Sequence, residues 1–217
     1  MEDNLGMYVG LQEEEAYFDY LEHKSRNPLR RWFHSNRFVV CENLVHKYYR
    51  DKMTIIDLGC GSCNWNKLGL PVIGVDSSKK VLDYAKRNSR IKKAIQKSVT
   101  CTGIREGTAD IVLLFGVLEH IKRYQDVLRE ANRVLKNGGV VISSVPHDTW
   151  FSLWRPLFVL HCFFQGTILK KEYFRKMAGH VVQFSQEKMR HAYQMAGFQV
   201  LEQFSTHRME IYTVGRK

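Results

Sequence analysis

The hydrophobic positions of the first part of the chain follow a helical spacing. Leucine and phenylalanine residues stand among acidic residues in the stretch 11–23, which predicts an amphipathic helix. A second helix is expected from Pro28 to Tyr49, because proline is well placed in the first turn of a helix. The chain is therefore expected to open with helices.

After residue 50 the pattern changes to short apolar runs that alternate with amphipathic stretches. Such uninterrupted runs are typical of strands buried on both faces of a sheet. Between them, helices are expected over residues 77–88 and 121–135, and the pair Gly138-Gly139 is expected to stop the second helix. Alternating strands and helices predict parallel βαβ units in a doubly wound α/β sheet. The expected strands cover residues 53–59, 71–76, 109–115 and 140–146.

The C-terminal part of the chain predicts one helix followed by two strands. Ser185 is a suitable N-cap, and Gly197 follows the last apolar position of this helix. The apolar stretches 198–204 and 209–215 have no helix between them, so we expect an antiparallel pair that closes the sheet. The expected organisation is an N-terminal helical segment (1–50), a core (51–146), an insertion (147–180) and a closing helix with two strands (181–217).

The chain is strongly basic, with a formal net charge of +11 and a pI of about 9.5. Such a charge favours anionic partners, among them nucleic acid, phospholipid surfaces and phosphorylated metabolites. The alternative is that the charge lies on exposed helix faces and serves solubility. Composition alone leaves both interpretations open.

The cysteines and the N-terminus indicate a compartment. Five cysteines without regular spacing argue against a disulfide framework and for a reducing environment. The N-terminus lacks the basic and apolar regions of a signal peptide, and polar residues interrupt the most apolar window, which begins at Trp150. We therefore expect a cytoplasmic protein.

The stretch "IIDLGCGSCNW", residues 55–65, carries two signals that point to different chemistry. Cys60 and Cys63 form a C-x-x-C, but a zinc site usually needs two more ligands at close spacing and a redox pair needs an exposed thiolate. Gly59 and Gly61 follow a predicted buried strand, at the edge where open α/β sheets bind ligands. Because glycine lets the backbone come close to a cofactor, we favour a cofactor-binding loop.

Acidic residues beside this loop indicate the kind of cofactor. Asp76 ends the next predicted strand, where a carboxylate can hydrogen-bond both hydroxyls of a ribose. A dinucleotide would need glycine where the chain has Asn64, and Asp57 would repel its pyrophosphate. S-adenosylmethionine carries an ammonium and a sulfonium and has no phosphate, so it fits these acids better.

Four stretches, in this order, resemble the motifs of class I S-adenosylmethionine-dependent methyltransferases: "IIDLGCGSC", "VIGVDSS", "ADIVLLFGVLEHI" and "VLKNGGVVISSVP". The resemblance covers residues 53–146 and extends more weakly to "GHVVQFSQEKMRHAYQMAGFQVLE", which looks like the closing segment of the small-molecule, ubiquinone-biosynthesis-like branch. It implies a Rossmann-like sheet, mostly parallel with an antiparallel final strand, a small helical cap, and S-adenosylmethionine as cofactor.

The resemblance also implies roles for individual residues. The loop would lie under the methionine and ribose of the cofactor, Asp76 would bind the ribose hydroxyls, and Ser77 would lie beside the adenine. Cys63 departs from the pattern, because it stands where the family has a third loop glycine. The implied cofactor-binding residues are Asp57, Gly59, Cys60, Gly61, Asp76, Ser77, Phe115, Gly116 and Val117.

Methyl transfer requires aligned reactants, and it needs a general base only when the acceptor arrives protonated. His120 and His147 follow predicted strands at the ligand edge and are the candidate bases; His180 is a further residue that could face the substrate. In the alternative, Glu119 and His120 cap the following helix. Some quinone-precursor O-methyltransferases carry an additional acid where this chain has Gly116, so the resemblance implies no metal site.

The insertion and the basic surface suggest partners. Aromatic residues beside the cluster "LKKEYFRK" suit a lid over a small or lipid-like acceptor, or a peripheral membrane contact through residues 150–176. An ordinary helical cap is the alternative. Nucleic acid is a less favoured partner, and the sequence does not define the oligomeric state. A backbone-contacting basic face would consist of Lys79, Lys80, Lys86, Arg87, Lys92 and Lys93.

The expected function is therefore S-adenosylmethionine-dependent methyl transfer to a small or lipid-like acceptor, at oxygen rather than nitrogen. One alternative is an RNA or protein methyltransferase that uses the basic surface. Another is a non-catalytic binding or scaffold protein that retains the methyltransferase fold.

Overall fold

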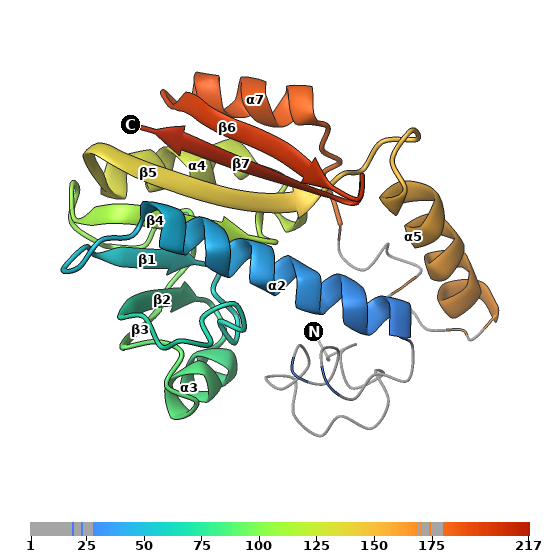
Figure 1. Cartoon of the computed structure of the whole chain (residues 1–217), viewed down its shortest axis with the longest axis horizontal. Coiled ribbons are helices and arrows are strands. Elements are labelled where there is room, and N and C mark those ends of the chain that lie inside the picture. Colours follow the sequence, from blue (N-terminus) through green and yellow to red (C-terminus); the bar gives the residue numbers. More distant parts are fainter. Residues whose placement is uncertain (1–18, 20–22, 24–27, 169, 171–173, 175–179) are drawn as a thin grey trace.

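A seven-stranded sheet lies at the centre of the molecule (Figure 1). The computed structural model describes residues 19, 23, 28–168, 170, 174 and 180–217. The strands are β1 (Ile55–Leu58), β2 (Val72–Asp76), β3 (Lys93–Gln96), β4 (Ala109–Phe115), β5 (Leu135–Pro146), β6 (Gln199–Thr206) and β7 (Glu210–Arg216).

The strands lie in the order β3-β2-β1-β4-β5-β7-β6. All neighbouring strands from β3 to β5 pair in parallel, whereas β7 runs antiparallel to both β5 and β6. This confirms the expected Rossmann-like fold class, a mostly parallel sheet with an antiparallel closing strand. The order also places β1 beside β4 at the centre, so the loops that follow these two strands meet at the carboxyl edge of the sheet.

Helices cover both faces of the sheet. Residues of α2 and α3 share one buried apolar cluster, and residues of α4 and α7 share the other. The strand β1 contributes to both, since Ile55 belongs to the first cluster while Ile56 and Leu58 belong to the second. The helices are α2 (Pro28–Tyr48), α3 (Lys79–Arg87), α4 (Tyr124–Val134), α5 (Trp154–Phe163) and α7 (Gln186–Met195), with a 3-10 turn η3 (Leu118–His120) and a π turn η4 (Phe164–Ile168).

Most elements occur where the sequence predicts them. Helix α2 begins at Pro28, and α7 is capped by Ser185, whose hydroxyl accepts from the Lys188 amide at 3.1 Å. Gly197 follows α7 with a φ of 83°, a left-handed conformation that favours glycine. The helix predicted over 11–23 lies outside the described residues, apart from two of them.

Two features differ from the expectations. The short edge strand β3 was not expected, because its two end residues are exposed, its two middle residues are only half-buried, and they form no extended apolar run. Helix α4 ends at Val134, and β5 begins at once, with Leu135 buried and paired with Ala109. The pair Gly138-Gly139 therefore lies inside a strand and does not stop the helix.

The insertion forms helix α5, which stands beyond the carboxyl ends of the parallel strands (Figure 1). It reaches back to the first half of α2, where Trp154 stacks on Phe33 with ring centroids 5.1 Å apart. Within the part of the chain that the structure describes, no helix is both long and apolar enough to cross a bilayer.

Glu130 of α4 holds the loop after β3 in place. Its carboxylate accepts from the amide and hydroxyl of Thr102, at 2.9 and 2.6 Å, and from Arg133 at 2.7 Å. Burial by itself would raise the pKa of Glu130, but the bonds from Arg133 and Thr102 lower that pKa to about 2. The carboxylate therefore stabilises the folded state above its unfolded pKa, and this contribution is lost as the pH falls through about 2.

We expect Glu130→Gln to lower the free energy of unfolding by about 1–3 kcal/mol at neutral pH. The difference from the wild type should shrink as the pH falls below about 4, because the wild-type carboxyl is then protonated in the unfolded state. Urea unfolding at a series of pH values measures this. A difference that does not change with pH would contradict the assignment.

Candidate active site

A cavity of about 390 Å³ lies at the carboxyl edge of the sheet. The loop after β1, the end of β4, the start of β7, helix α2 and the insertion all contribute to its wall. The lining residues are Phe33, His34, Arg37, Phe38, Cys41, Asp57, Gly59, Cys60, Gly61, Ser62, Cys63, Asn64, Trp65, Phe115, Gly116, Glu119, His120, Pro146, Trp154, Leu157, Phe158, His161, Phe174, His180, Met209 and Glu210.

The loop after β1 is held against β2 by its backbone. The amides of Gly59 and Cys60 donate to the carbonyl of Val75, at 2.7 and 3.1 Å. The Gly61 amide donates to one carboxylate oxygen of Asp76 at 2.9 Å, and the other oxygen accepts from the amide of Ser78. Asp76 therefore fixes the loop to the start of α3.

Asp57 lies at the end of β1, buried beneath this loop. One of its oxygens accepts from Trp65 Nε1 at 2.8 Å and from the Cys63 thiol at 3.6 Å, while the other has no hydrogen-bond partner. Burial raises the pKa of Asp57 to about 7, against the bonds from Trp65 and Cys63 and with a smaller contribution from the charge of Asp76. A buried oxygen without a partner at a cavity wall is suited to a bound cation.

Cys60 and Cys63 are both buried beside Asp57. Burial, and then the charge of Asp57, raise the pKa of both thiols well above the ordinary value. Such thiols form thiolates poorly, so the structure gives no support to a redox pair. Cys63 has a φ of 50°, the left-handed conformation that glycine adopts more easily.

An arginine from α2 reaches the end of β4. The Nε atom of Arg37 lies 3.1 Å from a carboxylate oxygen of Glu210, and its side chain is only 13% exposed. Gly116 has a φ of 69°, and a Cβ there would overlap the Arg37 guanidinium. Burial raises the pKa of Glu210 to about 7, while the charge of Arg37 opposes this shift and that of Glu119 adds to it.

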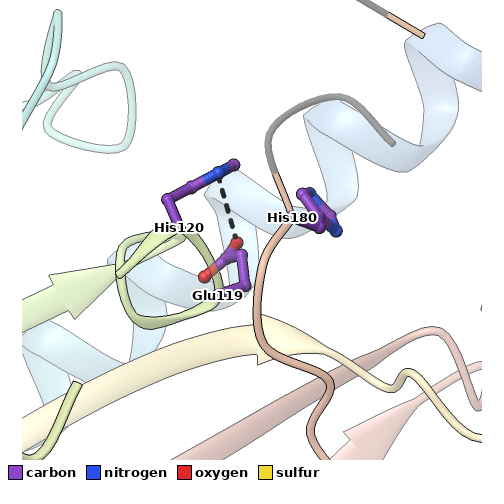
Figure 2. Close-up of side chains that lie close together, drawn as sticks. All are labelled: Glu119, His120 and His180. Atoms are coloured by element: carbon purple, nitrogen blue, oxygen red, sulfur yellow. Dashed lines mark ion pairs between the residues drawn. The ribbon is translucent and has the colours of Figure 1, made fainter. Parts of the chain in front are cut away.

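Glu119, His120 and His180 lie together at this end of the cavity (Figure 2). The His120 Nε2 atom is 3.8 Å from a Glu119 oxygen, and the rings of His120 and His180 meet edge to face with centroids 5.0 Å apart. Burial, with the charges of His120 and Arg37, lowers the pKa of His180 to about 3, so its imidazole is neutral. One ligand atom of each side chain lies within 4.8 Å of the others, so the three could hold a metal ion.

Aromatic rings form the wall opposite the loop. Trp154 stacks between Phe33 and Phe158, with centroids 5.1 and 5.0 Å away, and Phe158 stacks on His180 at 4.8 Å. This series joins α2, α5 and the segment after the insertion. One part of the cavity is therefore apolar and flat-sided, next to the Glu119–His120–His180 cluster.

The structure brings most of the expected site residues to this cavity. Asp57, Cys60 and His120 line it, as do the loop glycines and the residues at positions 115 and 116. Asp76, Ser77 and Val117 are not among its lining residues. Asp76 holds the loop through the Gly61 amide, and Val117 packs against Gly59, where a Cβ would come within 2.6 Å of a Val117 methyl.

His147, an expected general base, lies outside the cavity. Its Nδ1 atom is 3.4 Å from the hydroxyl of Ser205 on β6, and its backbone pairs with Phe184 and Met209. The reason is that β5 continues to Pro146, so the next residue is still held between strand neighbours. Asp148 is ion-paired with Arg155 at 2.7 Å and lines a more open, polar depression of about 520 Å³ on the other side of the His180 segment.

Sequence reasoning missed several residues of the cavity. Arg37 and Phe33 belong to α2, and Glu210 belongs to the last strand, far from every motif. Their positions depend on how α2 crosses the sheet and on how β7 pairs with β5. No local pattern in the chain signals either contact.

Comparisons with known proteins find methyltransferases. Residues 56–143 match the family model described as a methyltransferase domain. The ribosomal protein L11 methyltransferase of Dictyoglomus thermophilum is 32% identical over 114 residues, which is 49% of this chain and 36% of that protein. The ubiquinone biosynthesis O-methyltransferase of a Bradyrhizobium species is 32% identical over 108 residues, 46% of this chain and 42% of that protein.

A solved structure of a SAM-dependent methyltransferase from Aquifex aeolicus superimposes with a TM-score of 0.64 at 12% identity, covering 93% of this chain and 97% of that one. The likeness to that structure concerns the fold alone. Part of the chain, residues 56–143, therefore resembles a methyltransferase domain, and the similarity implies S-adenosylmethionine as cofactor. The chain spans about a third to a half of the length of the curated relatives it matches.

The contact between Gly116 and Arg37 can be tested with a matched pair of variants. Gly103 has nearly the same φ, 70°, but a Cβ there would meet nothing within 4 Å. We expect Gly103→Ala to cost about 1–2 kcal/mol from backbone strain alone. Gly116→Ala should cost about 1–3 kcal/mol more, because it also displaces the buried guanidinium. If urea unfolding showed the same loss of unfolding free energy for both variants, Arg37 would not need the space beside Gly116.

Proposed function

We propose that this protein transfers the methyl group of S-adenosylmethionine to a hydroxyl oxygen of a small or lipid-like acceptor. The observation that carries the proposal is a single cavity that joins two different environments. At one end is the glycine loop with a buried carboxylate, and at the other is an aromatic chamber beside two histidines. A small-molecule methyltransferase needs this combination, because cofactor and acceptor must meet in line and out of water.

The residues at the loop end fit the cofactor. The unpaired oxygen of Asp57 would receive the ammonium of the methionine moiety, and the glycines leave room for the backbone to approach it. Each oxygen of Asp76 accepts one backbone amide and has lone pairs left for the ribose hydroxyls, with Ser77 beside the adenine. When bound there, the cofactor supplies an electrophilic sulfonium methyl group.

The residues at the aromatic end fit an acceptor that must lose a proton. A hydroxyl is a weak nucleophile until its proton leaves, so it needs a polar group nearby that assists the loss of the proton. The walls of the aromatic chamber consist mainly of aromatic carbon and offer few such groups. Within the described lining, His120 and Glu119 supply polar side-chain atoms beside Gly116, at the end of β4. We therefore place the acceptor oxygen next to these two side chains. One relative named above is a ribosomal protein L11 methyltransferase, and another is a ubiquinone biosynthesis O-methyltransferase. Because these names point to different acceptors, we base the acceptor class on the cavity.

The charge of Asp57 makes cofactor binding depend on pH. Its pKa is raised to about 7, and a bound ammonium would favour the ionised form. We expect the affinity for S-adenosylhomocysteine, which has the same ammonium, to fall as the pH is lowered through about 7, approaching tenfold for each further unit. Asp57→Asn should bind more weakly and lose this dependence.

Calorimetric titration between about pH 5.5 and 7.5 measures the effect. Because the pKa of Glu210 at the same cavity is also raised to about 7, only the part of the pH dependence that Asp57→Asn removes is assigned to Asp57. Comparison with Asp57→Asn separates Asp57 from the histidines. If the wild-type affinity did not vary with pH, the proposal that Asp57 binds the ammonium would be wrong.

We further propose that the insertion contacts an anionic membrane surface, from which a lipid-like acceptor would enter. Its outer side carries large apolar side chains in water, including Phe151 at 86% and Leu160 at 65% exposure, on a chain of net charge +11. Exposed apolar side chains of this kind on a basic chain are typical of peripheral membrane segments. The exposed apolar residues are Trp150, Phe151, Leu153, Leu157, Leu160, Phe163, Phe164 and Ile168.

We expect the protein to float with vesicles of phosphatidylglycerol and phosphatidylcholine, and much less with phosphatidylcholine alone. The double variant Phe151→Ser, Phe163→Ser should lose most of this binding. Leu68→Ser is the matched control, because Leu68 is 72% exposed but follows the loop after β1, away from the insertion. If the control and the double variant float equally, the insertion is not the contact.

A further inference from the structure

The cluster of Glu119, His120 and His180 has the composition of a metal site. We propose that these three side chains bind one divalent transition-metal ion at the acceptor end of the cavity (Figure 2). The role we give the ion rests on the proposed function, but its binding does not.

The three ligand groups are brought together by backbone contacts. Glu119 and His120 belong to the turn η3, which follows β4. The amides of Val181 and Val182 donate to the carbonyl of Glu119, at 2.9 and 3.1 Å, and so hold the segment after the insertion against η3. His180 precedes these two residues and therefore lies beside Glu119 as a consequence of the fold.

Two buried atoms of this cluster, one on Glu119 and one on His180, have no hydrogen-bond partner. Glu119 is only 3% exposed, and its Oε2 atom has no hydrogen bond. The Nδ1 atom of His180 is likewise buried without a partner. An unpaired carboxylate oxygen and an unpaired imidazole nitrogen are costly to bury, and a cation bound by both side chains would offset this cost. The nearby guanidinium of Arg37 interacts with Glu119 through its charge. However, its ion-pair and hydrogen-bond contacts are with Glu210, 3.1 Å from its Nε, and with the Ser144 hydroxyl, 3.5 Å from its Nη2.

The ligand types indicate the class of ion. Two imidazoles and one carboxylate suit zinc, manganese, iron or cobalt, whereas magnesium and calcium prefer sites made of oxygen atoms. Three protein ligands leave at least one position open, as in catalytic metal sites. All three side chains line the cavity, so the open position faces the space we assign to the acceptor.

A bound ion would give the site a way to ionise the acceptor. A hydroxyl that fills the open position loses its proton to solvent at a lower pH than in water. Its oxygen then forms the bond to the methyl carbon while the carbon–sulfur bond breaks. The products are the methyl ether and neutral S-adenosylhomocysteine, so charge and atoms balance.

The ligand set also explains why this site could not be recognised from the sequence. The resemblance to known methyltransferases implied no metal because Gly116 offers no acid. His180 supplies a ligand instead, and it lies on the far side of the insertion from η3. Only the folded chain brings it within reach.

The test is calorimetric titration of the full chain, freed of metal with a chelator, with Zn²⁺ and with Mn²⁺. We expect one ion per chain, with a micromolar or tighter dissociation constant for Zn²⁺. Glu119→Gln, which keeps the shape of the side chain, and His180→Ala should each weaken binding roughly 100-fold.

Two exposed residues serve as controls for adventitious binding. His46→Ala and Cys101→Ser remove surface ligands far from the cluster and should leave the affinity unchanged. Folding of every variant is checked by its titration with S-adenosylhomocysteine. The metal site would be overturned if zinc still bound to Glu119→Gln and to His180→Ala with the wild-type affinity. It would also be overturned if the wild type bound S-adenosylhomocysteine but not zinc.

The same titrations separate this inference from the proposed function. If S-adenosylhomocysteine binds and zinc does not, the metal site fails while the cofactor site stands. If zinc binds with the expected dependence on Glu119 and His180 but S-adenosylhomocysteine does not bind, the metal site stands and the methyltransferase proposal loses its basis.

Discussion

The position of the site depends on the close approach between the segment that follows β1 and the segment that follows β4. Gly59 and Val117 touch so closely that a Cβ at Gly59 would lie 2.6 Å from a Val117 methyl. This contact is a consequence of parallel pairing between β1 and β4, which brings both carboxyl ends to one edge. It places the loop above Asp57 beside the turn that carries Glu119, so the regions that we propose for cofactor and acceptor share one cavity.

The cavity has more negative than positive groups among its buried side chains. Asp57, Glu119 and Glu210 are each at most 3% exposed, and Arg37 is the guanidinium that faces them within the described lining. Burial raises the pKa of both Asp57 and Glu210 to about 7. A positively charged ligand would complete the balance, and a cofactor with an ammonium and a sulfonium has that charge. A divalent ion at Glu119 would meet the remaining deficit.

The sequence predicted the parts of the site that depend on local order. A buried strand followed by glycines places Asp57, Gly59 and Gly61 at the edge of the sheet, and the structure has them there. The edge strand β3 could not be predicted, because residues such as Lys93 are exposed and leave no apolar pattern. The partnership of Arg37 with Glu210 joins the first described helix to the last strand, and the position of His180 depends on hydrogen bonds to Glu119. Contacts of this kind arise from tertiary packing, and neither hydrophobic periodicity nor residue propensity along the sequence indicates them.

The account is tested most directly by following the methyl group itself. The protein is incubated with methyl-labelled S-adenosylmethionine and a total cell extract, and the products are divided into organic-soluble, protein and RNA fractions. The account predicts label in a small organic-soluble product, bound through an ether oxygen. Label in the protein or RNA fraction alone would contradict it and would turn attention to the basic surface of α3.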